Sequence, residues 1–400
     1  MTTVQSSTTA SASQHQVVTY PLRQLLLYFL RLGTLGFGGP VALVGAMHRD
    51  LVEQRGWVAE EDDKEGLALA QLAPGPLAEQ LAIYLGYLHY RLVGATLIGL
   101  AFVAPSFVMV LALGWLYVLY SGLSWMHAVF YGVGACVIGI IARSAYQLTR
   151  KTVGADRLLW AIYLIAAALT VITKSEQVLL FLLAGIVAWL WTAPPTSLAR
   201  LGQVVRFAGA PVAAAGAAPA AHAGTLWTMF TFFAKAGALV FGSGLAIVPV
   251  LYGGVVQEHH WLTEHQFVDA IAVAMITPGP VVITTGFIGF LVAGFAGASV
   301  AALATFLPCY LITVIAAPYF HRYGKRLAIA AFVKGVTAAA VGAITGAVLI
   351  LAQRSITDVV TVALALATAA ILWRTKRVPE PVLVLGAAVI GLVAYPLVGR

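Results

Sequence analysis

Long apolar stretches separated by short polar loops fill almost the whole chain. Read as helices, they predict membrane spans near 20–47, 64–88, 92–120, 126–149, 158–173 and 177–193, and again near 225–252, 267–293, 295–320, 327–352, 356–373 and 379–397. A helix needs about 20 apolar residues to cross a hydrocarbon core of about 30 Å, and the stretches do not alternate as barrel strands do. We therefore predict an all-α polytopic membrane protein with about 10–13 transmembrane helices.

Composition supports the same class of protein. The 400 residues are 61% hydrophobic and only 10% charged, whereas soluble domains are about 45–50% apolar and about 25% charged. The net charge of +8 comes from Lys and Arg in short loops, as cytoplasmic loops of membrane proteins require, so we predict no nucleic-acid partner. Cys136 and Cys309 lie inside apolar runs and are interpreted as packing residues. We expect no metal, no cofactor and, without a P-loop, no ATP-driven transport.

The second half of the chain repeats the first. Pro278 follows Pro74 by 204 residues, and Trp261 and Gly237 follow Trp57 and Gly33 by the same distance. Because tryptophan, proline and glycine all recur at the same spacing, we infer an internal duplication. In membrane proteins such duplications are typical of transporters with a site between the repeats. We divide the chain into a disordered tail (1–19), a first repeat (20–193), an Ala/Pro/Gly-rich linker (194–224) and a second repeat (225–400).

The relative orientation of the repeats follows from their charged loops. Basic residues follow the fourth span of the first half, but the third and fifth spans of the second half. Because basic loops face the cytoplasm, this pattern predicts inverted repeats with the amino terminus inside. Six spans in the first half would instead give parallel repeats; we give the charge pattern more weight.

Two glycine-rich segments interrupt apolar spans. The first comprises Gly36, Phe37, Gly38, Gly39 and Pro40, and the second includes Gly242, Ser243 and Gly244. Such breaks are tolerated in a membrane only where protein or water satisfies the freed backbone groups. Free N–H groups at the start of a half-helix then favour an anion. Close helix packing through small residues is the alternative.

A Pro-Gly-Pro element follows each glycine-rich segment. The elements are Pro74, Gly75, Pro76 and Pro278, Gly279, Pro280, with polar neighbours Gln71, Glu79, Gln80, Thr277, Thr284 and Thr285. Proline donates no N–H and pushes its predecessor out of helix, so each element starts a new half-helix. Amide and hydroxyl groups at such breaks suit an oxyanion; a kink without function is the simpler interpretation.

Charged residues within the spans are the remaining candidates. Arg31 and Lys235 occupy equivalent positions, two residues before the glycine that the repeats share. They attract an anion or reach the interface with their long side chains. Glu79 is either a proton-coupling group or the partner of a cation. An intramembrane enzyme using Glu79, Asp269 and the cluster His259, His260 and His265 is a remote alternative.

These motifs resemble the chromate ion transporter family in its long, two-domain form. Phe37–Pro40, Arg55–Trp57 and Gln71–Pro76 followed by Glu79-Gln80 resemble the first domain, and 241–244, 261–264 and 277–280 the second. The chain departs from the family pattern at Ser243 and at His259-His260. The resemblance covers about residues 21–320 and implies a bacterial inner-membrane carrier that exports chromate and confers resistance, with sulfate as the chemical analogue.

We therefore expect a secondary transporter rather than an enzyme, with chromate or a sulfate-like oxyanion as its cargo and the lipid bilayer and a second copy of itself as partners. A sulfate or other oxyanion carrier, working in uptake or exchange, is the alternative. The residues expected to bind the oxyanion are those of the four breaks, their polar neighbours, Arg31 and Lys235.

Overall fold

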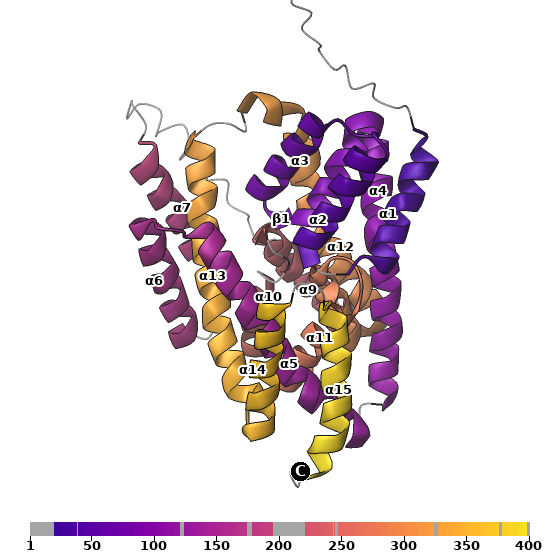
Figure 1. Cartoon of the computed structure of the whole chain (residues 1–400), viewed down its shortest axis with the longest axis vertical. Helices are drawn as coiled ribbons and strands as arrows, with labels where there is room; N and C mark the ends of the chain where they lie inside the picture. The colour runs from indigo at the N-terminus through magenta and orange to yellow at the C-terminus, as the bar shows by residue number, and fades with distance from the viewer. Residues whose placement is uncertain are drawn as a thin grey trace, which may run out of the picture.

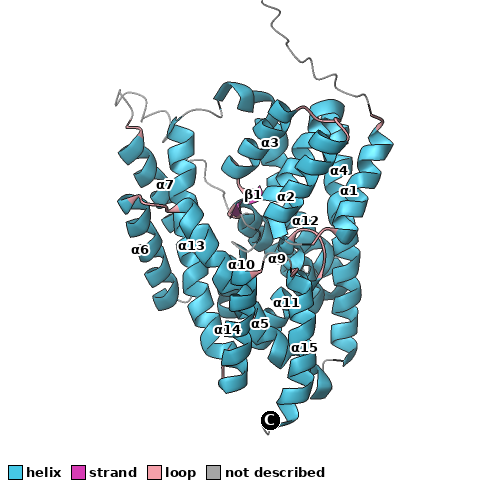
Figure 2. Ribbon diagram, in the orientation of Figure 1, coloured by secondary structure: helices cyan, strands magenta, loops and turns pink. Residues whose placement is uncertain are grey.

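The computed structural model describes residues 20–37, 39–120, 124–173, 178–194, 221–242, 244, 247–323, 327–375 and 378–397. The predicted tail 1–19 and most of the predicted linker therefore lie outside the described residues. Within the described ranges the chain is a bundle of helices joined by short turns, with two strands of two residues each at its centre (Figure 2).

The described elements of the first repeat run as follows: α1 (Leu22–Leu35), α2 (Gly39–Met47), the π-helical turns η1 (His48–Gln54), α3 (Glu60–Leu72), β1 (Gly75–Pro76), α4 (Leu77–Tyr120), α5 (Ser124–Thr152), α6 (Arg157–Thr173) and α7 (Val178–Thr192). Those of the second are α9 (Ala221–Ala238), β2 (Phe241–Gly242), α10 (Ile247–Leu251), η4 (Tyr252–Glu258), α11 (Glu264–Ile276), η5 (Val281–Ile283), α12 (Thr284–Tyr323), α13 (Leu327–Ser355), α14 (Val359–Arg374) and α15 (Glu380–Leu397). α9 begins inside the predicted linker.

The expected spans 20–47 and 64–88 each consist of two shorter helices that meet at a break. α1 has 14 residues and is thus about 21 Å long, too short to cross a core of about 30 Å. It ends at Gly36, whose N–H donates to Leu32 O. α3 ends at Leu72 because Pro74 cannot continue the ladder. The breaks are those that the glycine and proline motifs predict.

α4 and α12 are each two helices joined by a tight turn. The backbone leaves helical geometry at Arg91 in α4 and at Ala293 and Gly294 in α12. Across each turn two glycines touch: a Cβ on Gly86 would lie 2.6 Å from Gly94 O, and one on Gly289 would lie 2.3 Å from Gly297 O. Each turn thus closes a helical hairpin in which only glycine permits so close an approach.

Both repeats share local details, which confirms the duplication. The π-helical turns η1 and η4 occupy equivalent positions. The N–H groups of Trp57 and Trp261 donate to Leu51 O and Val255 O, both at 2.8 Å. Gly33 packs on the backbone of Phe102 as Gly237 packs on that of Thr305.

The repeats are intertwined and run in opposite directions. The long part of α4 descends through the molecule, whereas α12 ends at the upper end, where α13 begins (Figure 1). α5 packs against α14 and α15 of the other repeat, and α13 against α6 and α7. Helices of one repeat therefore pack directly on those of the other, and the arrangement agrees with the inverted orientation expected from the basic loops.

Among the described helices, five are long and apolar enough to cross a membrane: those at Leu77–Tyr120, Trp125–Thr152, Val281–Phe320, Leu327–Gln353 and Glu380–Leu397. Shorter apolar helices lie at Arg157–Thr173, Leu179–Thr192, Ile247–Glu258 and Val359–Arg374. The chain is a multi-pass membrane protein.

Candidate functional site

The four breaks meet at the centre of the molecule, and each pairs with a break of the other repeat. Gly75 N–H donates to Val240 O at 2.5 Å, and Gly279 N–H donates to Gly36 O at 3.0 Å. Around the first bond, β1 and β2 form a short parallel ladder. We call the four non-helical segments 36–37, 73–76, 239–242 and 277–280 the crossing. It satisfies part of the backbone that the motifs free.

Glycine is required at the middle of each Pro-Gly-Pro element. Gly75 has φ +142° and Gly279 has φ +96°, values that side chains rarely adopt. A Cβ on Gly75 would lie 2.6 Å from Cys309 Sγ, and one on Gly279 would lie 2.1 Å from Ser106 Oγ. Both backbone conformation and space therefore exclude a side chain at these two positions.

Ser106 is a residue of the crossing that sequence reasoning missed. It is fully buried, and its hydroxyl lies 2.7 Å from Pro278 O and 3.4 Å from Gly33 O. Its counterpart is Cys309, which occupies the same place against Gly75. A second spacing in the sequence could have indicated Ser106. Pro105-Ser106 and Pro308-Cys309 are 203 residues apart, one residue fewer than the spacing of 204 that reveals the repeat.

Glu79 and Gln80 lie in the first turn of α4, directly after β1. They are 3% and 0% exposed. Gln80 Nε2 donates to Pro74 O at 2.7 Å, which satisfies a carbonyl of the break. Glu79 Oε2 and Gln80 Oε1 are buried without a hydrogen-bond partner among the described residues. These two acceptors are the unsatisfied polar atoms closest in sequence to the crossing.

The threonine hydroxyls of the second repeat are engaged within their own helices. Thr277 donates to Val273 O and Ala274 O, Thr284 to Val281 O, and Thr285 to Val282 O. All three are buried. Gln71, by contrast, is exposed on α3.

The glycine-rich motifs supply the partner strands of the crossing. Gly36 lies within it, Phe37 is 42% exposed, and Gly39 and Pro40 begin α2. In the second repeat Gly242 belongs to β2 and Gly244 is buried against Val281 and Val282. Gly38 and Ser243 lie outside the described residues.

Arg31 and Lys235 are exposed on α1 and α9, one turn before the crossing. The ion pairs of the described residues do not involve them. These pairs gather instead at η1 and α3: His48 with Glu53 and Asp63, Arg49 with Asp50, and Lys64 with Glu60. Arg31 and Lys235 therefore carry charges that these ion pairs do not neutralise.

The residues of the enzyme alternative do not come together. Asp269 accepts a hydrogen bond from Tyr117 at 2.8 Å, and His259 stacks on Trp261 at 4.4 Å. Within the described residues no hydrogen bond joins Asp269 or His259 to Glu79. Within these residues no three His, Cys, Asp or Glu side chains gather as metal ligands do.

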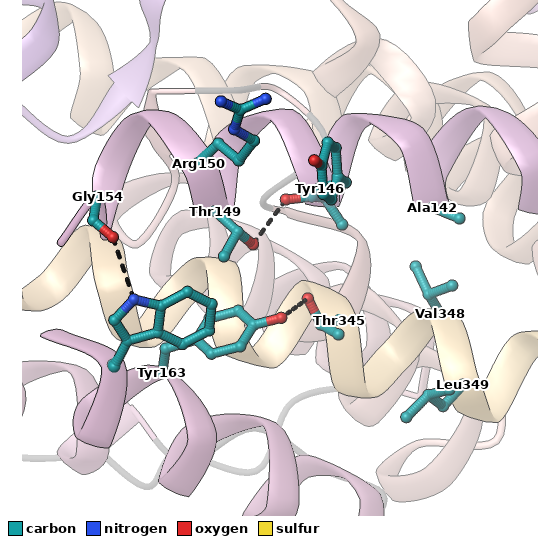
Figure 3. Close-up of a pocket in the computed structure, with 11 residues that line it drawn as sticks. Ala142, Tyr146, Thr149, Arg150, Gly154, Tyr163, Thr345, Val348 and Leu349 are labelled. Atoms are coloured by element: carbon teal, nitrogen blue, oxygen red, sulfur yellow. Dashed lines mark hydrogen bonds between the residues drawn. The ribbon is translucent and has the colours of Figure 1, made fainter. Parts of the chain in front are cut away.

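A hollow of about 660 Å³ lies between α5, α6 and α13 (Figure 3). Trp160 Nε1 donates to Gly154 O and Tyr163 donates to Thr345 along its wall. Its lining includes none of the predicted site residues. The hollow is therefore distinct from the crossing.

The comparisons with known proteins agree with the geometry. The sequence profile "Chromate transporter" matches residues 23–189 and 227–392. A "Chromate transport protein" of Cupriavidus metallidurans is 68% identical over 98% of this chain and 97% of its own length. A "Probable chromate transport protein" of Synechococcus elongatus is 58% identical over 95% and 98%, and a "Chromate transport protein" of Pseudomonas aeruginosa is 30% identical over 95% and 93%.

No solved structure matches the chain. The profile nevertheless matches twice, once in each repeat, and the relatives align over nearly their full length. The chain, with its duplicated and intertwined breaks, therefore belongs to the chromate transporter family.

Proposed function

We propose that this protein exports chromate across the inner membrane of a bacterium and so confers chromate resistance. One observation carries the proposal: the exchanged hydrogen bonds by which Gly75 meets Val240 and Gly279 meets Gly36. Two inverted repeats that meet at broken helices form the substrate site of secondary transporters. Breaking one bond while keeping the other would open the centre to one side at a time.

The chemistry of the crossing suits a tetrahedral oxyanion. α4 begins directly after the crossing, and α2 and α12 begin a few residues beyond it; the positive ends of helix dipoles favour negative charge. Arg31 and Lys235 provide two exposed cations nearby. We assign substrate binding to the break residues and their polar neighbours, and to Ser106 the task of holding Pro278 in place.

The membrane potential supports export. Moving one charge across the membrane is worth about 2.3 kcal/mol per 100 mV. A dianion that leaves a cell with a negative interior therefore gains roughly twice that amount for the same potential. Accumulation of chromate would need an additional driving force.

The test is radiolabelled chromate flux in vesicles that contain the purified protein, with an imposed potential. Flux should follow the potential, and the double variant Pro76→Ala with Pro280→Ala should insert normally but lose flux. An excess of sulfate in the same vesicles distinguishes a chromate carrier from a general sulfate-like carrier. Lack of flux in the unaltered protein would refute the proposal.

The oligomeric state and the limits of the repeats remain part of the proposal. We propose a homodimer, which mass measurement of the detergent-solubilised protein tests. We also propose that 20–193 and 225–400 are the functional units, since the profile matches lie within them. Co-expression of the two halves as separate chains should restore flux if they assemble as the intertwined fold requires.

A further inference from the structure

Glu79 presents a buried carboxyl that takes part in none of the ion pairs of the described residues. Its side chain is 3% exposed and its Oε2 has no hydrogen-bond partner among the described residues. The cations Arg31 and Lys235 are exposed and take no part in the described ion pairs. An ionised carboxylate without a partner is costly to bury, so the acid is neutral in this state and holds a proton.

The other buried titratable groups among the described residues do not pair with Glu79. Cys309 of α12 lies close enough to Glu79 for their charges to interact, and its thiol is buried as well. The acid of α3 that is buried, Asp63, is engaged with His48 at 2.7 Å. Asp269 of α11 is engaged with Tyr117. Glu79 is thus the buried acid near the crossing that lacks a partner.

The position of Glu79 connects it to the opening of the crossing. It lies three residues after Pro76, in the turn of α4 that follows the β1–β2 ladder. If the bond between Gly75 and Val240 opens, water reaches this turn first and the acid can ionise. An oxyanion at the crossing repels an ionised carboxylate, so substrate and proton occupy the centre together.

The second repeat has no such group. In the registers of 204 and 203 residues, the equivalents of Glu79 are Ile283 and Val282, both buried and apolar. Each chain therefore offers one proton site for two symmetry-related breaks. The acid is therefore not among the features that the two breaks share.

We propose that Glu79 couples transport to protons: one proton travels with each oxyanion, in the same direction, so that a dianion crosses as one net negative charge. The inference rests on the function proposed above. One net negative charge still leaves with the membrane potential, with half the electrical driving force of the bare dianion, and transport now also depends on the pH difference across the membrane.

The experiment uses vesicles at fixed potential, in alkaline buffers in which chromate is a dianion on both sides. With one-to-one coupling, each pH unit across the membrane should change the equilibrium distribution of chromate about tenfold. Glu79→Gln, which keeps the shape but cannot release a proton, should remove this response. Glu61→Gln, at an exposed acid of α3, is the matched control and should keep it.

A second readout does not depend on the variant. A pH-sensitive dye trapped inside the vesicles should report one proton per labelled chromate in the unaltered protein. Chromate flux without proton movement, or a Glu79→Gln protein that still responds to pH, would overturn the proton site and leave the transport function intact. A complete lack of chromate flux would instead refute the transport function itself.

Discussion

The two repeats build the same break with different chemistry. In the first, the carbonyl of Pro74 is satisfied by Gln80, from the same break. In the second, the carbonyl of Pro278 is satisfied by Ser106, from the other repeat. The glycines next to these prolines likewise face different atoms, a thiol at Cys309 and a hydroxyl at Ser106. Duplication therefore preserved the path of the backbone, while the groups that hold it diverged.

This difference shows where each repeat depends on the other. The first break carries its own hydrogen-bond donor, whereas the second needs α4 of its partner repeat. The first break also carries Glu79, which has no equivalent in the second. Substitutions at matched positions should consequently differ between the repeats in ways that the sequence register alone does not indicate.

The largest effects are expected at the glycines of the crossing. Gly75→Ala and Gly279→Ala place a side chain at positive φ, which costs about 1–3 kcal/mol, and add overlap with a neighbouring side chain. Both should lose folded protein in detergent, measured by size-exclusion chromatography and thermal unfolding. Adding Ser106→Ala should partly rescue Gly279→Ala, because it removes the atom that lies 2.1 Å away.

Cys309→Ala is the corresponding partner for Gly75→Ala and should rescue it less. The overlap there is milder, at 2.6 Å, and is shared with Gln80 Nε2. Equal rescue in both repeats would show that the two breaks are equivalent and would contradict the comparison.

Ser106→Ala by itself should be the next largest perturbation. It leaves Pro278 O without its donor in a buried position, at a cost of about 1–3 kcal/mol. Cys309→Ala removes only packing and should cost roughly 1 kcal/mol. Thermal unfolding of the two variants in one detergent ranks them, and an unchanged midpoint for Ser106→Ala would argue against the hydrogen bond.

The hairpin turns of α4 and α12 should respond in opposite directions. Gly294 and Arg91 share almost the same backbone angles, φ 58° with ψ −147° and φ 51° with ψ −140°. Gly294→Ala should destabilise by about 1–2 kcal/mol, because a residue with a side chain is strained there. Arg91→Gly should stabilise by up to about 1 kcal/mol, less what its contact with the Tyr87 ring contributes.

A lower melting temperature for Arg91→Gly would show that the contact with Tyr87 outweighs the strain. Arg91→Ala separates the two contributions, since it removes the guanidinium but keeps the strained backbone.

The smallest effects are expected at the caps of α6 and α14, again matched between repeats. Asp156 accepts from Leu158 N–H and Leu159 N–H, and Asp358 accepts from Thr361 N–H and Tyr131 Oη. Replacing a capping Asp by Ala typically costs about 1 kcal/mol. Partial burial alone would raise the pKa of Asp358, but the hydrogen bonds from Thr361 and Tyr131 lower it overall.

The lowered pKa of Asp358 determines how its contribution to stability changes with pH. The stabilisation is fully present above the pKa of the unfolded chain and is lost as pH falls through the lower folded value. Unfolding midpoints of the unaltered protein and Asp358→Ala should therefore converge in acid. A difference that persists at the lowest pH would show that Asp358 acts without its charge.

Much of this architecture was predictable because local chemistry determines it. Apolar stretches must become helices in a membrane, and the breaks follow from residues such as Gly36, Pro74 and Pro278, which cannot continue a helix. The register of 204 residues revealed the duplication, and the basic loops indicated the inversion. The long hairpins inside α4 and α12 agree with expected spans that end near 88 and 293.

The contacts at the centre were not predictable in the same way. Each Pro-Gly-Pro element pairs with the segment at the glycine-rich motif of the other repeat, and the register of the repeats does not indicate that pairing. Thr284 and Thr285 were candidates because they are polar, but their hydroxyls serve their own helix. Ser106 was passed over, because a serine in an apolar run commonly donates to its own helix.

The sequence by itself determined the class of protein, the two repeats and the places where helices must stop, since these depend on neighbours along the chain. Only the tertiary structure decided which break meets which, and that Glu79 is buried without a partner while Arg31 and Lys235 are exposed. The physical reason is that partners at the crossing, such as Gly36 and Gly279, are far apart along the chain, and only the packed fold determines which donor reaches which acceptor.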